Sequence, residues 1–178
     1  SAKTVPESQS ALDSTKEDLV PVNSMVHRRL EAPVVSRTIA GKYQVIGRLG
    51  EGGMGVVYRA IHSLSKMRVA LKVVHPHLCQ GPQGIERFRR EVSASAEIDH
   101  PGLVKVYDAG VDDEGSYYIA MELLEGESLL DRSKRAPYSP SDALIWIKGI
   151  LGPLAKAHER GFVHRDLKPD NVFLAQID

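Results

Sequence analysis

An eight-residue polar segment near the C-terminal end of the chain constrains this sequence more than any other feature. It reads His164-Arg165-Asp166-Leu167-Lys168-Pro169-Asp170-Asn171. The segment offers one carboxylate, one ammonium group two residues later and one amide three residues beyond that. Phosphoryl transfer uses groups of these kinds, because a carboxylate can orient an attacking hydroxyl, a cation can stabilise the moving phosphate and an amide oxygen can bind a metal ion. The rest of the chain is therefore interpreted as the part that holds a nucleotide above this segment.

A glycine-rich stretch between two predicted strands is the second constraint. Residues 43–49 and 56–60 are rich in strand-forming side chains, and between them Gly50, Gly52 and Gly55 give the spacing G-x-G-x-x-G. Without Cβ atoms this backbone can bend sharply and bring its N–H groups close to phosphate oxygens. In dinucleotide-binding folds the same spacing opens a helix, whereas a strand follows here. We therefore predict a hairpin over phosphates, although the stretch alone would equally suit an ordinary flexible hairpin.

Lys72 lies among apolar neighbours in a third predicted strand, residues 68–74. A lone lysine in a strand is usually a surface residue that buries only its stem. Placed one strand after a glycine-rich stretch, it resembles the lysine of protein kinases that pairs with the nucleotide's phosphates, and that lysine needs a counter-charge. The predicted helix over residues 82–98 offers Glu86 and Glu91. Glu86 is also spaced to pair with an arginine of its own helix.

Together these features resemble the eukaryotic-type serine/threonine protein kinases. The octapeptide resembles their catalytic loop, and its Asp-Leu-Lys-Pro form is that of serine/threonine rather than tyrosine kinases. Residues 52–55 and 157–161 resemble the bacterial members. The resemblance covers residues 41–178. It implies an α+β, protein-kinase-like fold with a complete five-stranded small lobe, one helix in that lobe, and the beginning of a helical large lobe.

The resemblance also assigns roles within the octapeptide. Asp166 would orient the substrate hydroxyl, Lys168 would neutralise charge on the transferred phosphate and Asn171 would ligate Mg²⁺. His164 is expected to pack and to bond backbone, and Arg165 to meet a phosphorylated activation segment.

On the nucleotide side, the resemblance selects Glu91 as the partner of Lys72. It places Met121 at the back of the adenine site and residues 122–124 in the hinge beside it. The implied nucleotide-binding residues are Leu49, Gly50, Glu51, Gly52, Gly53, Met54, Gly55, Val56, Val57, Ala70, Lys72, Glu91, Met121, Glu122 and Leu124.

Three segments follow from this interpretation: a flexible leader over residues 1–40, a small ATP-binding lobe over 41–124, and the incomplete start of a large lobe over 125–178. The leader is assigned from its polar composition, which buries too little surface to offset the entropy of ordering. No Asp-Phe-Gly follows Asn171, so we expect residues 1–178 on their own to be inactive or nearly so.

The implied activity is transfer of the ATP γ-phosphate to serine or threonine hydroxyls of a protein substrate, with ATP and Mg²⁺ as cofactors. The alternative is an inactive kinase-like module that binds a nucleotide or a partner, and a small-molecule phosphotransferase ranks third. The sequence has 23 basic and 23 acidic residues, so no global field favours nucleic acid. It has no apolar run of the roughly 20 residues that span a bilayer, and its single cysteine fits a reducing cytoplasm.

Several local expectations can be compared with the structure. Residues 103–107 and 117–121 are predicted strands, and residues 127–132 a short helix. A longer helix is predicted to begin at residues 139–142 and to kink or break at Pro153. His158 on its inner face is expected to be a packed histidine.

Overall fold

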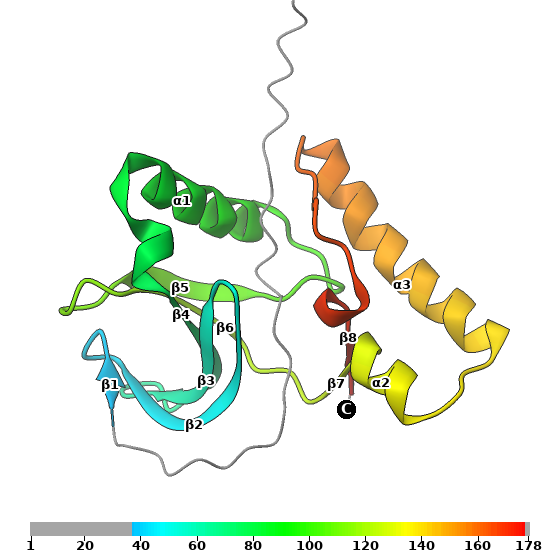
Figure 1. The fold of residues 1–178 in the computed structure, drawn as a ribbon, viewed down its shortest axis with the longest axis horizontal. Helices are drawn as coiled ribbons and strands as arrows, with labels where there is room; N and C mark the ends of the chain where they lie inside the picture. Colours follow the sequence, from blue (N-terminus) through cyan, green and yellow to red (C-terminus); the bar gives the residue numbers. More distant parts are fainter. Residues whose placement is uncertain (1–36, 177–178) are drawn as a thin grey trace, which may run out of the picture.

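The computed structural model describes residues 37–176. Figure 1 shows a curled sheet and helix α1 on one side, helices α2 and α3 on the other, and the polar segment of residues 164–171 running between them. The elements in chain order are β1 Thr38–Ile39, β2 Tyr43–Gly52, β3 Gly55–His62, β4 Arg68–Val74, η1 Pro76–Cys79, α1 Gly81–Glu97, β5 Val106–Val111, β6 Tyr117–Glu122, β7 Gly126–Ser128, α2 Leu129–Arg135, α3 Pro140–Glu159, η2 Pro169–Asn171 and β8 Phe173–Ala175.

The main sheet is antiparallel, with the strand order β1-β2-β3-β4-β6-β5. Its five long strands are those expected of the small lobe. The two-residue strand β1 is an addition that the sequence did not indicate, and it pairs Ile39 with Tyr43. Because Ile39 is only 1% exposed, the packed part of the chain begins before residue 41, inside the segment predicted to be a flexible leader.

Strand β4 is buried on both faces, which explains its nearly continuous apolar sequence. Val69 and Leu71 enter one core cluster, which also contains Tyr43, Tyr118 and other residues of β1, β2, β3 and β6. Ala70, one residue out of phase, enters a second cluster on the opposite face. The alternation of side chains along a strand thus gives β4 two separate packing surfaces.

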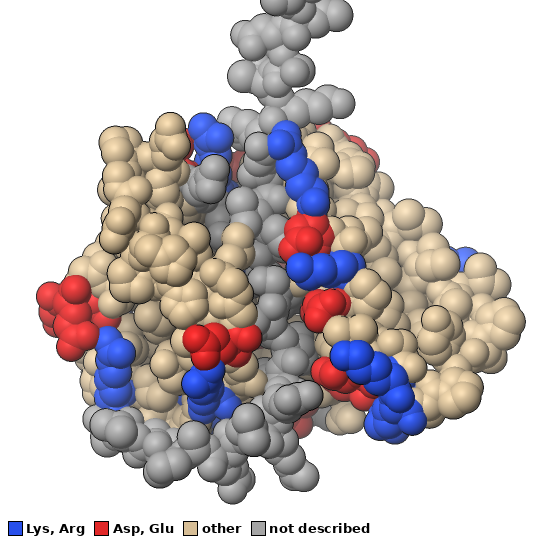
Figure 2. All heavy atoms as spheres, viewed as in Figure 1, with Lys and Arg blue, Asp and Glu red and all other residues tan. Residues whose placement is uncertain are grey.

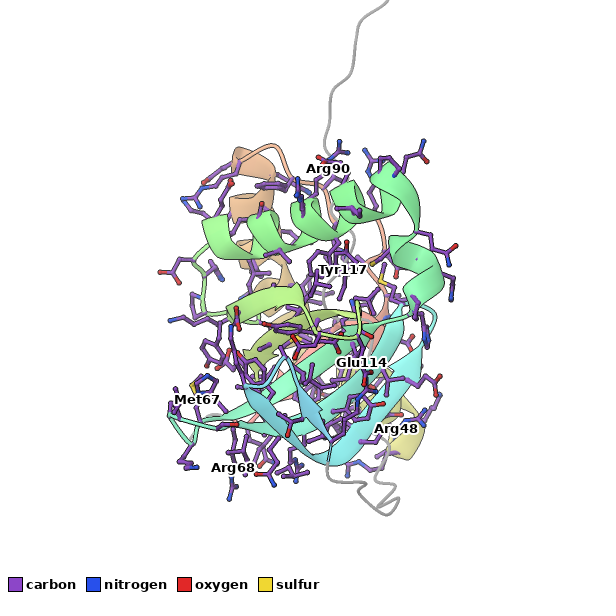
Figure 3. The ribbon with its side chains drawn as sticks, turned by 90° about the vertical axis from the view of Figure 1, so that its left-hand side faces the viewer. Arg48, Met67, Arg68, Arg90, Glu114 and Tyr117 are labelled. Carbon is purple, nitrogen blue, oxygen red and sulfur yellow. The ribbon has the colours of Figure 1, made fainter. Side chains whose placement is uncertain are left out.

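Helix α1 covers the sheet through aromatic contacts. The rings of Phe88 and Tyr117 meet edge to face with their centroids 4.9 Å apart, and Figure 3 shows Tyr117 between the sheet and α1. Phe88 also packs in a cluster with Val74 and Ile119. The predicted pairing within α1 is present, since Arg90 Nε donates to Glu86 Oε1 at 3.3 Å.

A polar cluster centred on Asp108 joins the two ends of the curled sheet. One oxygen of Asp108, on edge strand β5, accepts hydrogen bonds from Tyr43 at 2.9 Å, Lys42 at 3.2 Å and Tyr118 at 3.2 Å. Burial alone would raise the pKa of Asp108, but these three donors together hold it below its ordinary value. Lys42 and Tyr43 belong to the β1–β2 end, so the cluster fixes the curl of the sheet.

Two local predictions are wrong in the region between the lobes. The strand predicted at residues 103–107 lies at Val106–Val111, because Leu103 instead closes a turn on His100. The short helix predicted at residues 127–132 begins only at Leu129. Ser128 caps this helix by accepting a hydrogen bond from the N–H of Asp131. Ser128 is also the last residue of strand β7, which directly precedes the helix.

Of the kink or break expected at Pro153, the break is absent, because helix α3 runs continuously through this residue. Pro153 is buried, and it lies against the turn that precedes β5, since a Cβ built on Gly102 would come within 3.0 Å of its ring. We attribute the tolerance of Pro153 to this packing. His158 is exposed rather than packed, whereas the neighbouring Ala157 is buried with Ile98.

The start of α3 is as predicted. Ser139 and Asp142 form a reciprocal capping box, in which Ser139 Oγ accepts from the N–H of Asp142 and the Asp142 carboxylate accepts from the N–H of Ser139.

The surface of the molecule carries a mixture of charges. Figure 2 shows acidic and basic side chains close together on the visible face, and a broad area of other side chains over α3. Four large apolar side chains of α3 are at least half exposed: Leu144, Ile145, Ile147 and Leu151. None of the helices in the described part of the chain has an apolar stretch long enough to cross a membrane.

We predict that Asp108→Asn lowers the free energy of unfolding by about 1 to 3 kcal/mol at pH 7, because three donors lose a charged acceptor. The lowered pKa of Asp108 means that its contribution is present above the ordinary value of 3.8 and is lost as the pH falls through the folded-state pKa. Urea unfolding at several pH values should therefore show the two proteins converging under acid. The exposed Asp113→Asn on the same hairpin is the control; a constant gap down to pH 3 would contradict the assignment.

Candidate active site

The glycine-rich stretch forms the predicted hairpin turn between β2 and β3. Gly52 pairs with Gly55 at its end. Gly55 has a φ of 156°, and a Cβ at this position would lie 2.1 Å from the carbonyl oxygen of Val73 on β4. No side chain fits there, so the third glycine of the motif is required by the close approach of β4. The turn is thereby held directly over that strand.

Lys72 lies on β4 beneath this turn. Its side chain is among the most buried in the described residues, at 2% exposure, and its ammonium nitrogen lies 3.7 Å from the sulfur of Met54 at the tip of the turn. A surface role for Lys72 is thereby excluded. Glu91 lies in α1, but its side chain falls outside the part that the structure describes.

Four of the residues expected to bind the nucleotide form one apolar cluster: Leu49, Val57, Ala70 and Met121. They come from four strands, and the antiparallel register sets Ala70 opposite Met121. Val104, Val106 and Leu123 pack against the same cluster. Leu123 belongs to the predicted hinge, whereas Val104 and Val106 were missed in the sequence, because their contact depends on how the segment at the start of β5 crosses the sheet.

The predicted hinge leaves the sheet at the end of β6. The backbone N–H of Glu122 is occupied, since it donates to the carbonyl of Lys105 at 2.8 Å. Leu124 lies between β6 and β7 and is partly buried. A ligand bound at this hinge would therefore form its hydrogen bonds with backbone groups other than the N–H of Glu122.

The octapeptide is a bent loop whose backbone is fixed at Arg165. The N–H of Asp166 donates to the carbonyl of His164 at 2.7 Å, and Arg165 between them has a φ of 54°. This three-residue turn with a positive φ is strained for a side chain such as arginine. Strain of this kind is typical of functional loops, and here it turns Asp166 back toward the residues that follow it.

Three polar side chains of the loop converge. The carboxylate of Asp166 lies 3.0 Å from the ammonium of Lys168 and accepts from the amide of Asn171 at 3.0 Å. The same amide donates to the carbonyl of Asp166 at 2.6 Å. The hydrogen bond with Lys168, followed by that with Asn171, holds the pKa of Asp166 below its ordinary value, so Asp166 is a carboxylate at neutral pH.

The side-chain oxygen of Asn171, Oδ1, is available as an acceptor because only the amide nitrogen is used in the hydrogen bonds to Asp166. Its side chain is buried, and within residues 37–176 no group donates to Oδ1. A buried acceptor without a donor is costly unless a ligand satisfies it. His164 Nδ1 is likewise without a described partner. Burial lowers the pKa of His164, which favours the neutral ring.

Comparison with known proteins agrees with this geometry. The sequence profile described as "Protein kinase domain" matches residues 43–178, which include both the glycine-rich turn and the polar loop. The chain belongs to the protein kinase family. Its relatives include the serine/threonine-protein kinase PrkC of Bacillus subtilis, 36% identical over 142 residues, which span 79% of this chain and 22% of PrkC.

Other relatives and solved structures give the same result. PknL of Mycobacterium tuberculosis, also a serine/threonine-protein kinase, is 35% identical over 85% of this chain and 38% of its own. A crystal structure of the Mycobacterium tuberculosis PknI kinase domain superposes with a TM-score of 0.69 at 33% identity, over 81% of this chain and 59% of that one. The kinase fold is thus confirmed, and the chain spans well under half the length of these full-length relatives.

We predict that Gly55→Ala destabilises the chain by about 2 to 4 kcal/mol, because it adds backbone strain and a collision with Val73. Gly53→Ala is the matched control. A Cβ there meets nothing within 4 Å among the described residues, so the change should stay within about 0.5 kcal/mol. Thermal or urea unfolding of both variants measures the difference, and equal effects would contradict the close approach.

We predict that Lys168→Gln raises the pKa of Asp166, because it removes the first of the two hydrogen-bonding groups that lower it. Carboxyl carbon NMR titration measures this pKa. Lys156→Gln is the control, since Lys156 is similarly exposed but pairs with Glu159 on α3. An unchanged Asp166 pKa in the Lys168 variant would show that Asn171 alone sets it.

Proposed function

We propose that this chain carries the nucleotide-binding and catalytic-loop part of a serine/threonine protein kinase. The reaction is transfer of the ATP γ-phosphate to serine or threonine hydroxyls of a protein substrate. One observation carries this proposal: Asp166, Lys168 and the amide of Asn171 converge within hydrogen-bonding distance, and the buried amide oxygen is left open. The relatives named as serine/threonine-protein kinases support the choice of substrate class.

Asp166 is suited to receive the hydroxyl proton. Its carboxylate is ionised at neutral pH and is half exposed, at 46% of its side-chain surface. A serine or threonine hydroxyl can therefore donate to it and be oriented for attack. Lys168 contacts the same carboxylate, so its positive charge would lie next to the phosphate as charge develops there. Positioning and charge stabilisation are the contributions that phosphoryl transfer requires.

The adenine end of ATP would be bound on the small lobe. The apolar cluster of Leu49, Val57, Ala70 and Met121 offers a flat ring the kind of surface that most ligand sites have. Lys72 lies on the same strand as Ala70, two residues further along, and therefore on the same face of the sheet. Its ammonium group and the N–H groups of the glycine-rich turn would then contact the phosphates.

The donor set also fits Mg²⁺. This ion prefers oxygen ligands, and one or two protein oxygens together with phosphate oxygens usually hold it. Asn171 Oδ1 is a buried oxygen without a donor in the described chain. The nitrogen of the same amide donates hydrogen bonds to Asp166, which keeps the amide in place. When bound, Mg²⁺ would neutralise phosphate charge.

We predict that Asp166→Asn in the complete gene product lowers the turnover number by about 10²- to 10⁴-fold, since general-base groups contribute on this scale. The assay follows transfer of labelled γ-phosphate from ATP, with Mg²⁺, to a mixture of peptides that contain serine or threonine. Asp113→Asn, on the distant β5–β6 turn, is the control and should retain full turnover.

ATP binding by the Asp166→Asn variant should stay within about threefold of the wild type, because Asp166 lies in the loop and not on the nucleotide-binding strands. Binding without any phosphate transfer by the wild-type gene product would overturn the proposed activity. It would leave a nucleotide-binding module, which is the alternative that the sequence left open.

A further inference from the structure

His75 lies at the corner where β4 ends and η1 begins, and it contacts the glycine-rich turn through two groups. Its backbone N–H donates to the carbonyl of Met54 at 3.0 Å. Its ring nitrogen Nε2 lies 3.2 Å from the carbonyl oxygen of Gly52. A carbonyl oxygen can only accept a hydrogen bond, so Nε2 carries the proton and donates it. One residue therefore bonds two carbonyls of the turn.

Gly55 holds one end of the turn against β4, but the centre of the turn has little to fix it. At Gly53, a Cβ would meet nothing within 4 Å among the described residues, so the centre of the turn is not packed. Hydrogen bonds from outside the hairpin must therefore supply much of its order. The bond from His75 to Gly52 has a structural consequence as well. Because the C=O and N–H of a trans peptide point in opposite directions, it directs the N–H of Gly53 away from His75.

The ring of His75 has two neighbours besides Gly52. The ring of His77 stacks on it, with the centroids 5.6 Å apart and the planes 16° from parallel. Glu51 Oε1 lies 3.9 Å from Nε2, and Arg48 forms an ion pair with the same glutamate. The imidazole therefore has an aromatic neighbour on η1 and a carboxylate neighbour on β2, the strand that carries Gly52, but among the described contacts its only hydrogen bond to the turn is the one to the Gly52 carbonyl.

We propose that His75 is a positioning residue for the glycine-rich turn, and that its imidazole sets the turn over Lys72 so that a nucleoside triphosphate is bound by a preformed loop. This inference rests on the proposed function, because it concerns the ATP site of the same kinase. A free turn would have to be ordered when the phosphates bind, and that ordering would lower the affinity.

The first test is binding of a fluorescent N-methylanthraniloyl ATP, with Mg²⁺, to the 178-residue chain. His75→Ala should weaken binding by about 3- to 10-fold, the scale of one hydrogen bond. His75→Gln, whose amide nitrogen can replace Nε2 as the donor, should recover most of the affinity. His77→Ala is the matched control. It removes the stacked ring but neither bond to the turn, so it should change binding less than twofold.

The second test does not need a nucleotide. Amide hydrogen exchange of residues 50–55 should be faster in His75→Ala than in the wild type and should slow again in His75→Gln. Exchange of residues 69–73 in β4 should be equal in all three and confirms that the sheet is intact.

The two measurements separate the hypotheses. A wild-type chain that binds no ATP analogue would contradict the proposed nucleotide site, while exchange would still decide the role of His75. Unchanged exchange and affinity in His75→Ala would overturn the positioning role, and so would failure of His75→Gln to restore either one. An equal loss of affinity in His77→Ala would overturn it too, because that variant keeps the hydrogen bond.

Discussion

Strand β4 carries two different kinds of side chain on its two faces, and both the core of the sheet and the proposed nucleotide site depend on that separation. Val69 and Leu71 are fully buried in the core that closes the curled sheet. Ala70 and Lys72 face the other way, toward the apolar cluster and the glycine-rich turn. A shift of one residue in register would exchange the two sets and bury Lys72 in the apolar core. The register with β3 and β6 is therefore a requirement of the site as well as of the fold.

The polar loop of residues 164–171 is organised by a single amide in a comparable way. Asn171 uses its nitrogen to hold both the backbone and the carboxylate of Asp166. This leaves its oxygen as an acceptor. The β7–β8 ladder and the hydrogen bond that extends it fix the position from which the amide acts, because the N–H of Leu129, the first residue of α2, donates to the carbonyl of Val172, directly after Asn171. A short ladder that looks peripheral thus positions the one amide on which the loop depends.

Many features of the fold and of the candidate site could be predicted from the sequence, because they depend on residues that are close together in the chain. The glycine spacing, the apolar strand around Lys72 and the capping residues at Ser139 each depend on neighbours a few residues away, and the structure has all three. The convergence of Asp166, Lys168 and Asn171 is local too, since six residues contain them. The kinase resemblance then supplied the roles, which the residues alone do not give.

Three of the errors arose where tertiary contacts override local preference. Pro153 predicts a broken helix, but its ring packs on the turn at Gly102 and the helix continues. Helical spacing set His158 on an inner face, yet Ala157 occupies the contact and His158 is exposed. Strand β5 begins later than predicted because Leu103 turns toward α3 and packs with Ile98, Ala157 and Phe162.

All three errors concern one interface, formed by the segment after α1 and the second half of α3. The contacts there join residues about fifty positions apart in the sequence, a separation at which periodicity carries no information. This interface also connects the two functional parts. The segment on its small-lobe side leads through Val104 and Val106 into the apolar cluster, and α3 leads through Phe162 into the polar loop. The packing of Pro153 and Ala157 against that segment therefore helps set the polar loop relative to the strands of the proposed nucleotide site, which neither half of the sequence determines by itself.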